Sequence, residues 1–230
     1  MYGGTITKNT TGVSITGKFR MYGGTITGNT ATQSAGGLVN HGTAELYGGS
    51  IINNHGDSYG GVYAVGKLTV GGKVQITDNT YTYDNKTVAR NVYLINNYSG
   101  QKTLVIGVLD TGKDGAKIGV TTGKNLGSYE TRVQFATGAN SDEVKGCFFA
   151  DNGEYVVTRD GTKLYLGKHT HRYDYAPDTE HANTIKITCT ADGCPLDNGY
   201  VGSVTLGAPA HTVYGDGNEA HATLTWNEKY

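Results

Sequence analysis

The sequence contains few residues of several types, has no long apolar run and carries almost no net charge. Its 230 residues include three cysteines, three prolines, four phenylalanines and one tryptophan. No apolar run approaches the roughly 20 residues that a membrane-spanning helix needs, so we expect no membrane insertion. The formal net charge is −1, which gives no electrostatic basis for binding nucleic acid or an anionic membrane surface.

Acidic side chains are scarce in the first hundred residues, which contain four of them: Glu45, Asp57, Asp78 and Asp84. None of the four lies in the same column of the repeat described below as another. Glycoside hydrolysis needs two facing carboxylates, and uronate elimination needs carboxylates that hold Ca²⁺ beside a basic residue. The sequence therefore predicts a protein that is not an enzyme.

Glycine and tyrosine are abundant, with 36 and 17 copies, and both take part in an internal repeat. The segment "MYGGTITKNT" at 1–10 returns as "MYGGTITGNT" at 21–30 and, more loosely, as "LYGGSIINNH" at 46–55. Repeats of 20 to 50 residues are typical of stacked architectures. Because the sequence opens inside a repeat, we expect further repeats and domains in the parent chain.

Alignment of the repeats places like residues in columns. One column consists of isoleucines at intervals of 20, 25 and 25 residues: Ile6, Ile26, Ile51 and Ile76. Three places later comes a column of asparagines: Asn9, Asn29, Asn54 and Asn79. The short stretches between the columns alternate apolar and polar residues, which indicates strands rather than helices.

This pattern predicts an all-β solenoid with three short strands in each unit of about 24 residues. The isoleucines would form a buried ladder inside the coils. The asparagines would stand at the corners, where they tolerate left-handed conformations and can hydrogen-bond along the stack. The Gly-Gly pairs would supply bends that a residue with a Cβ atom could not adopt.

Beyond the regular repeats the pattern changes twice. We interpret residues 1–97 as regular coils and 98–167 as irregular final coils with a cap, together one domain of residues 1–167. Within the cap, 154–167 is predicted to form a hairpin with Asp160 and Gly161 as a type I′ turn. A polar, proline-containing junction starts at 168, and the strand-like segments after it indicate a small β module at 168–230.

These segments together resemble a family of repetitive cell-surface proteins from gut Firmicutes. The resemblance extends over about 1–167 and is carried by segments in a fixed order: 21–30, 60–63, 92–95, 104–107, 116–122 and 148–167. It implies a right-handed single-stranded parallel β-helix, followed by an Ig-like module in 168–230. It also implies secretion, a location on the bacterial cell surface and an adhesin-like role, and it brings no catalytic residue.

Cysteine and histidine leave three alternatives open in the second module. Cys189 and Cys194 flank the turn "TADG", which brings their side chains within reach of each other, and a disulfide is natural outside the cell. Because His169 and His171 share one face of an extended segment, the four side chains could instead form a structural zinc site. Two free thiols are the third alternative, and no other cofactor is predicted. Cys147 precedes two phenylalanines and is predicted to be a buried structural thiol.

Tyrosines form a further column on the outside of the predicted coils. Tyr2, Tyr22 and Tyr47 each stand directly before a Gly-Gly pair, so we expect them to form a surface ladder. Exposed aromatic rings with a hydroxyl group can stack on sugars or contact a protein partner. The alternative is that the rings stack on one another and stiffen the solenoid.

The sequence favours a non-catalytic extracellular module that acts as a spacer or adhesive scaffold and binds host or dietary glycans, or a host surface protein. A more specific form of this hypothesis is a carbohydrate-binding module. The alternative from a different class is a polysaccharide-active enzyme, either a lyase or a glycoside hydrolase.

Overall fold

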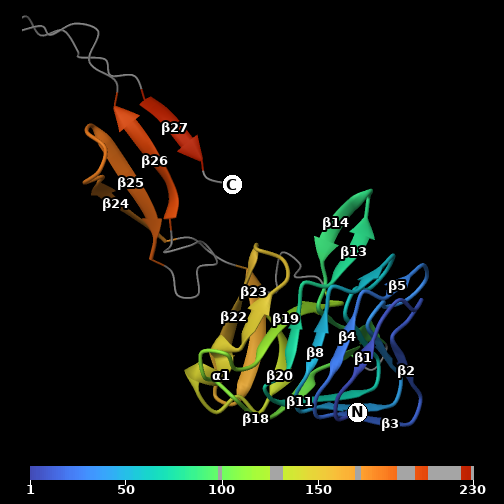
Figure 1. The fold of residues 1–230 in the computed structure, drawn as a ribbon. Helices are drawn as coiled ribbons and strands as arrows, with labels where there is room; N and C mark the ends of the chain where they lie inside the picture. The colour runs from blue at the N-terminus through green and yellow to red at the C-terminus, as the bar shows by residue number, and fades with distance from the viewer. Residues whose placement is uncertain (98–99, 125–131, 169–171, 191–199, 207–223, 229–230) are drawn as a thin grey trace, which may run out of the picture. The chain divides into compact units, whose positions relative to one another are not determined.

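The computed structural model describes residues 1–97, 100–124, 132–168, 172–190, 200–206 and 224–228. The chain divides into two compact units, Met1–Lys168 and His169–Tyr230. The described residues of both units are almost wholly β-structure, which confirms the predicted all-β class (Figure 1).

The first unit contains one large sheet of short, parallel strands. Its order is β1 (Thr5–Ile6), β4 (Thr25–Thr27), β8 (Ser50–Ile52), β12 (Gln75–Thr77), β19 (Lys117–Thr122), β15 (Val92–Leu94), β10 (Val62–Ala64), β6 (Leu38–Asn40) and β2 (Val13–Ile15). β21 (Phe148–Ala150) pairs with β19 outside this path. Figure 1 shows β1, β4 and β8 side by side, although they lie in successive repeats.

Two further sheets close the sides of the unit. One runs in the order β22 (Tyr155–Asp160), β23 (Lys163–Lys168), β20 (Arg132–Thr137), β18 (Leu104–Leu109), β11 (Lys67–Gly72), β7 (Thr43–Leu46) and β3 (Lys18–Met21). The other runs in the order β14 (Lys86–Ala89), β13 (Thr80–Tyr83), β9 (His55–Gly56) and β5 (Thr30–Ala31). β16 (Asn96–Asn97) and β17 (Gly100–Gln101) form a small hairpin.

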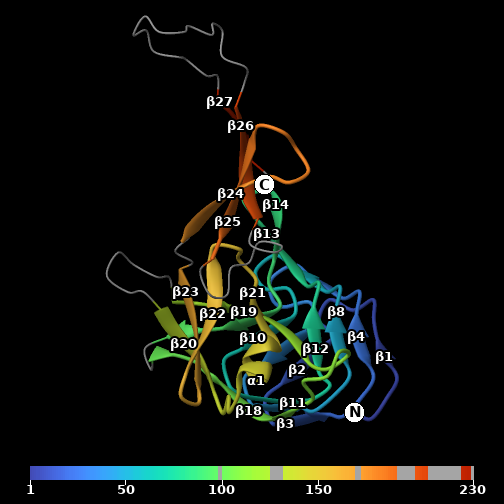
Figure 2. The same cartoon turned by 90° about the vertical axis from the view of Figure 1, so that its left-hand side faces the viewer.

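In the second and third coils the chain visits the sheets in the same order, for example β4, β5, β6 and β7 before it returns at β8. The coils that begin at β4 and β8 hold four strands rather than the predicted three, because a strand of two residues, β5 or β9, lies at the corner. The first coil holds the predicted three strands, β1 to β3. Figure 2 shows the stacked coils from a second side. The curled parallel sheets are compatible with a β-helix or solenoid.

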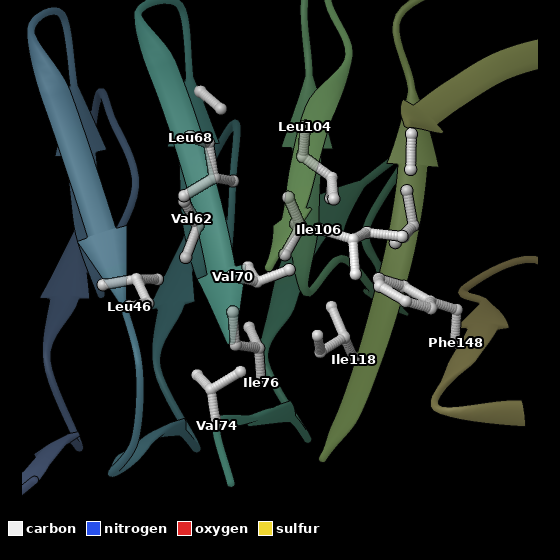
Figure 3. Close-up of a cluster of buried hydrophobic side chains, with 14 of the residues drawn as sticks. Leu46, Val62, Leu68, Val70, Val74, Ile76, Leu104, Ile106, Ile118 and Phe148 are labelled. Carbon is white, nitrogen blue, oxygen red and sulfur yellow. The ribbon is translucent and has the colours of Figure 1, made fainter. Parts of the chain in front are cut away.

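The predicted isoleucine ladder is present. Ile6 pairs with Ile26, Ile26 with Ile51, and Ile51 with Ile76. Ile118 continues the column beyond the recognisable repeats. All but the first are fully buried, and each such side chain contributes about 1.5–3 kcal/mol of hydrophobic stabilisation. Figure 3 shows Ile76 and Ile118 among the apolar side chains gathered between the strands.

The predicted asparagine ladder is also present. The backbone N–H and the side-chain Nδ2 of Asn29 both donate to Oδ1 of Asn54, at 3.2 and 2.9 Å. Asn54 donates in the same way to Oδ1 of Asn79, at 3.0 Å in both bonds, and Asn9 donates to Asn29. The side chains of Asn29, Asn54 and Asn79 are fully buried, so the ladder satisfies polar groups inside the coils.

The expectation that the ladder asparagines are left-handed is wrong. The positive φ angle belongs to the residue before each asparagine: Lys8 (60°), Gly28 (62°), Asn53 (54°) and Asp78 (59°). This residue makes the turn, and it thereby points the following asparagine inward, where its amide finds its partners. The bends at Gly-Gly are as predicted, since the second glycine has φ of 84° at Gly4 and 89° at Gly24.

The last coil abandons the repeat. β19 pairs with β12 through Lys117 and Ile118, and then with β15 through Val120 to Thr122, so it passes the corner without a turn. The regular asparagine position is therefore missing in this coil. After β20 comes a five-residue helix that the sequence analysis did not predict, α1 (Asp142–Gly146). No helix among the described residues is long and apolar enough to span a membrane.

A hairpin of β22 and β23 follows, as the sequence predicts. Asp160 pairs with Lys163, so the two central turn residues are Gly161 and Thr162 rather than Asp160 and Gly161. Positive φ occurs at Gly161, with 56°, and not at Thr162. A type I′ turn needs positive φ at both central positions, so the predicted turn type is wrong and the pattern is that of type II′.

The second unit contains one antiparallel sheet in the part that the structure describes. Its order is β24 (Tyr173–Pro177), β25 (Thr184–Cys189), β26 (Tyr200–Leu206) and β27 (Leu224–Glu228). On β25, Thr184, Ile187 and Cys189 are buried. The Ig-like character of this unit stays a prediction.

Candidate functional site

Three of the four residues of the predicted zinc or disulfide site, His169, His171 and Cys194, lie outside the described residues. Cys189 is buried at the end of β25. The disulfide, zinc and free-thiol alternatives therefore stay predictions. Within the described ranges, no group of three His, Cys, Asp or Glu side chains is placed to hold a metal ion. Cys147 is buried, as predicted, and this burial raises the pKa of its thiol.

The predicted tyrosine ladder has its rings stacked on one another. The ring centroids of Tyr2 and Tyr22 are 5.0 Å apart with 12° between the planes, and those of Tyr22 and Tyr47 are 5.5 Å apart at 25°. In the next coil Gly71 stands beside Tyr47, and the column stops there. Because its neighbours cover both faces of Tyr22, this ring offers its edge and hydroxyl group to a ligand rather than a free face.

A second group of aromatic side chains surrounds Arg90. Its guanidinium carbon lies 3.5 Å from the ring centroid of Tyr81 and 4.8 Å from that of Tyr93. Tyr59 and Tyr63 stack next to them with centroids 4.1 Å apart. Burial, together with the neighbouring Tyr59, raises the pKa of Tyr63 to about 12.

A pocket of about 580 Å³ opens beside this group. Its volume lies in the range of pockets that hold small ligands. Six of its lining side chains carry an aromatic ring or a charge: Tyr81, Arg90, Tyr93, Lys124, Asp151 and Tyr155. They come from the late coils and the cap, whereas the predicted tyrosine ladder lies on the first coils.

The asparagine ladder brings Asp151 to the pocket. Oδ1 of Asn91 accepts from the backbone N–H and Nδ2 of Asn79, at 2.9 and 3.0 Å, so Asn91 replaces the missing regular rung. Asn91 occupies the position in its coil that Gly37 and Gly61 occupy in the two preceding coils. A Cβ atom at Gly61 would lie 2.8 Å from the side chain of Asn79, which explains why the earlier coils carry glycine there.

Asp151 is the last rung. Its Oδ1 accepts from Nδ2 of Asn91 at 2.6 Å, and its Oδ2 accepts from the backbone N–H of Asn91 and the hydroxyl of Thr121, both at 2.8 Å. Burial raises the pKa of this carboxyl group, and it outweighs the three donors and the positive charge of Arg90, which act in the opposite direction. The carboxyl oxygens are thus engaged by the protein itself.

Sequence reasoning identified the ladder but not this pocket. Asn91 and Asp151 stand 12 and 60 residues after the preceding rung, so neither falls on the period of 25. A signal was present at 90–91, where "RN" replaces the Gly-Gly of 36–37 and 60–61. Comparisons of the chain with protein-family models, curated proteins and solved structures found no match.

Proposed function

We propose that the chain is a non-catalytic, extracellular scaffold module that binds carbohydrate in the pocket beside Arg90. In this proposal the first unit is a right-handed parallel β-helix that serves as a spacer on a bacterial cell surface, and the second unit is an Ig-like relay. The cell-surface part rests on the resemblance of the repeats. The binding part rests on the pocket.

The observation that carries the binding part is the composition of the pocket wall. Tyr81, Tyr93 and Tyr155 line a cavity large enough for one or two sugar rings, together with charged and amide side chains. Sugars present apolar ring faces edged by hydroxyl groups, and tyrosine offers an apolar face with a polar tip. Tyr2, Tyr22 and Tyr47 stack on one another and do not line this pocket, so we place the glycan in the pocket and not on the ladder.

Glycan cleavage is the competing candidate, because a carboxyl group with a raised pKa in a pocket is typical of a general acid. Two features speak for binding. Asp151 is the only carboxyl group among the described residues that line the pocket, whereas glycoside hydrolysis uses two. Its oxygens also accept hydrogen bonds from Asn91 and Thr121, which gives it a structural role.

Calorimetric titration of the folded chain with host and dietary oligosaccharides tests the proposal. We expect binding without new reducing ends or unsaturated products in the same samples. Tyr81→Ala should abolish binding, and Tyr83→Ala is the matched control, because Tyr83 lies on the same strand, is 66% exposed and does not line the pocket. Absence of binding to every glycan, or the appearance of cleavage products, would overturn the proposal.

A further inference from the structure

Arg90 is held in place before any ligand arrives. Its backbone N–H donates to the carbonyl of Asn79 at 2.8 Å, and its Nη1 donates to the carbonyl of Ser58 at 2.8 Å. The guanidinium group is stacked against the rings of Tyr81 and Tyr93. A planar guanidinium fixed in this way loses little conformational freedom when it binds an anion, and its fork of donors matches an oxyanion.

Within the described part of the chain, Arg90 forms no ion pair. No carboxylate of the described residues lies within ion-pair distance of it, and its Nη2 donates no hydrogen bond to them. Asp151, which lines the same pocket, directs its oxygens to Asn91 and Thr121 instead. Lys124 also lines the pocket, so the described residues of its wall carry two cationic side chains and one carboxyl group.

We infer that the pocket selects an anionic saccharide, whose carboxylate or sulfate group binds at Arg90 and Lys124 while a sugar ring lies against the neighbouring tyrosines. The inference rests on the proposed function, since it assigns a ligand class to the same pocket. The aromatic wall provides contact with the sugar ring, and the fixed guanidinium provides the preference for a negative charge.

Calorimetry with three trisaccharides of matched size provides the test. The probes are a galacturonic acid trisaccharide, a sulfated galactose trisaccharide and a neutral galactose trisaccharide. We expect at least one anionic probe to bind about tenfold or more tightly than the neutral one, which corresponds to one charge-assisted contact. Binding of the anionic probe should weaken as salt is added. The comparison between the carboxylated and the sulfated probe shows which oxyanion the pocket takes.

Two variants locate the effect. Lys124→Gln and Arg90→Gln should each weaken binding of the anionic probe about tenfold more than they weaken binding of the neutral probe. Arg90 packs between aromatic rings, so Arg90→Gln could unfold the chain, whereas Lys124 lies outside every strand and keeps the test valid. Lys86→Gln is the matched control, because Lys86 is an exposed lysine on β14 that does not line the pocket.

The outcomes separate the two proposals. If the neutral trisaccharide binds as tightly as both anionic ones, or if Lys124→Gln binds the anionic probe like the unchanged chain, the inference fails while the proposed function stands. If no saccharide binds to the folded chain, both fail.

Discussion

The asparagine ladder differs between the regular coils and its far end. In the coils it repeats one geometry, with Asn54 and Asn79 separated by 25 residues. At the end it changes spacing and chemistry, since Asn91 follows after 12 residues and Asp151 after another 60. An amide both donates and accepts, so it can be repeated in every coil, whereas a carboxylate accepts only. The comparison shows that the ladder has a direction and that its last rung must be an acceptor.

Replacing an inner asparagine of the ladder with aspartate should disrupt the ladder. Of all the predicted changes, we expect this one to lower the free energy of unfolding most. Nδ2 of Asn54 donates to the carbonyl of Ile26 at 2.9 Å and to Oδ1 of Asn79 at 3.0 Å. Asn54→Asp places an oxygen against these acceptors and buries an unpaired charge. We expect a loss of about 3–5 kcal/mol in the free energy of unfolding near neutral pH, measured by urea denaturation.

The control for this change is Asn9→Asp at the start of the ladder. Asn9 is exposed, so water can solvate the new charge, and we expect a loss below about 1 kcal/mol. Equal losses at Asn9 and Asn54 would contradict the view that the inner rungs are specified by their buried donors.

The far end of the ladder should be sensitive to crowding at Gly119. Gly119 lies beside the last two rungs, and a Cβ atom there would lie 2.3 Å from Oδ1 of Asp151 and 2.4 Å from Nδ2 of Asn91. We expect Gly119→Ala to cost about 1–3 kcal/mol in thermal or urea unfolding. Gly17→Ala is the control in the regular coils, because a Cβ atom at Gly17 has nothing within 4 Å. A harmless Gly119→Ala would show that the ladder end can shift.

The charge at the far end should also make stability depend on pH. The pKa of the Asp151 carboxyl group is raised by burial, against the opposing effects of Asn91, Thr121 and Arg90. The folded state then holds its proton at pH values where the unfolded state, with a pKa of about 4, has released it. This contribution to stability is complete below the unfolded pKa and decreases as pH rises through the folded pKa.

Asp151→Asn replaces the titrating carboxyl group with an amide, the group that the regular rungs of the ladder carry. The difference in melting temperature between the unchanged chain and the variant should therefore move in favour of the variant as pH rises from about 4 to about 7. Calorimetric scans across this range measure it. A difference that stays constant with pH would show that the carboxyl group is not perturbed.

The regular coils were predictable because their inner positions recur at similar intervals. Ile26, Ile51 and Ile76 repeat every 25 residues, and a residue that recurs once per coil must occupy the same place in each coil. The exact conformation at the corner was not predictable. A column of asparagines indicates a turn, but the sequence does not show whether the left-handed residue is Asn54 or the preceding Asn53.

The far end and the pocket were not predictable, because no period connects their residues. Asn91 and Asp151 meet only because β19 passes the corner without a turn and β21 pairs beside it. Likewise, Tyr81, Arg90 and Lys124 share a pocket through the path of the last coils and not through their spacing. The alternating pattern at 154–167 did predict a hairpin, but alternation does not fix which two residues close it.

The tyrosines also differ between the first coils and the far end, and here we expect the smallest effect. On the first coils Tyr2 is 84% exposed, whereas Tyr63 is shielded next to the wall of the pocket, and burial together with Tyr59 raises its pKa to about 12. The folded state therefore keeps the Tyr63 proton as pH rises from about 10 to about 12, and this contribution to stability is lost over that range.

Tyr63→Phe should remove one late step from the titration of tyrosine absorbance while the circular dichroism spectrum stays that of the folded chain. Tyr59→Phe should move the same step to lower pH without removing it, because burial alone still acts on Tyr63. If the late step survives in Tyr63→Phe, the shielded phenol is another residue and the two tyrosine groups differ less than their exposure indicates.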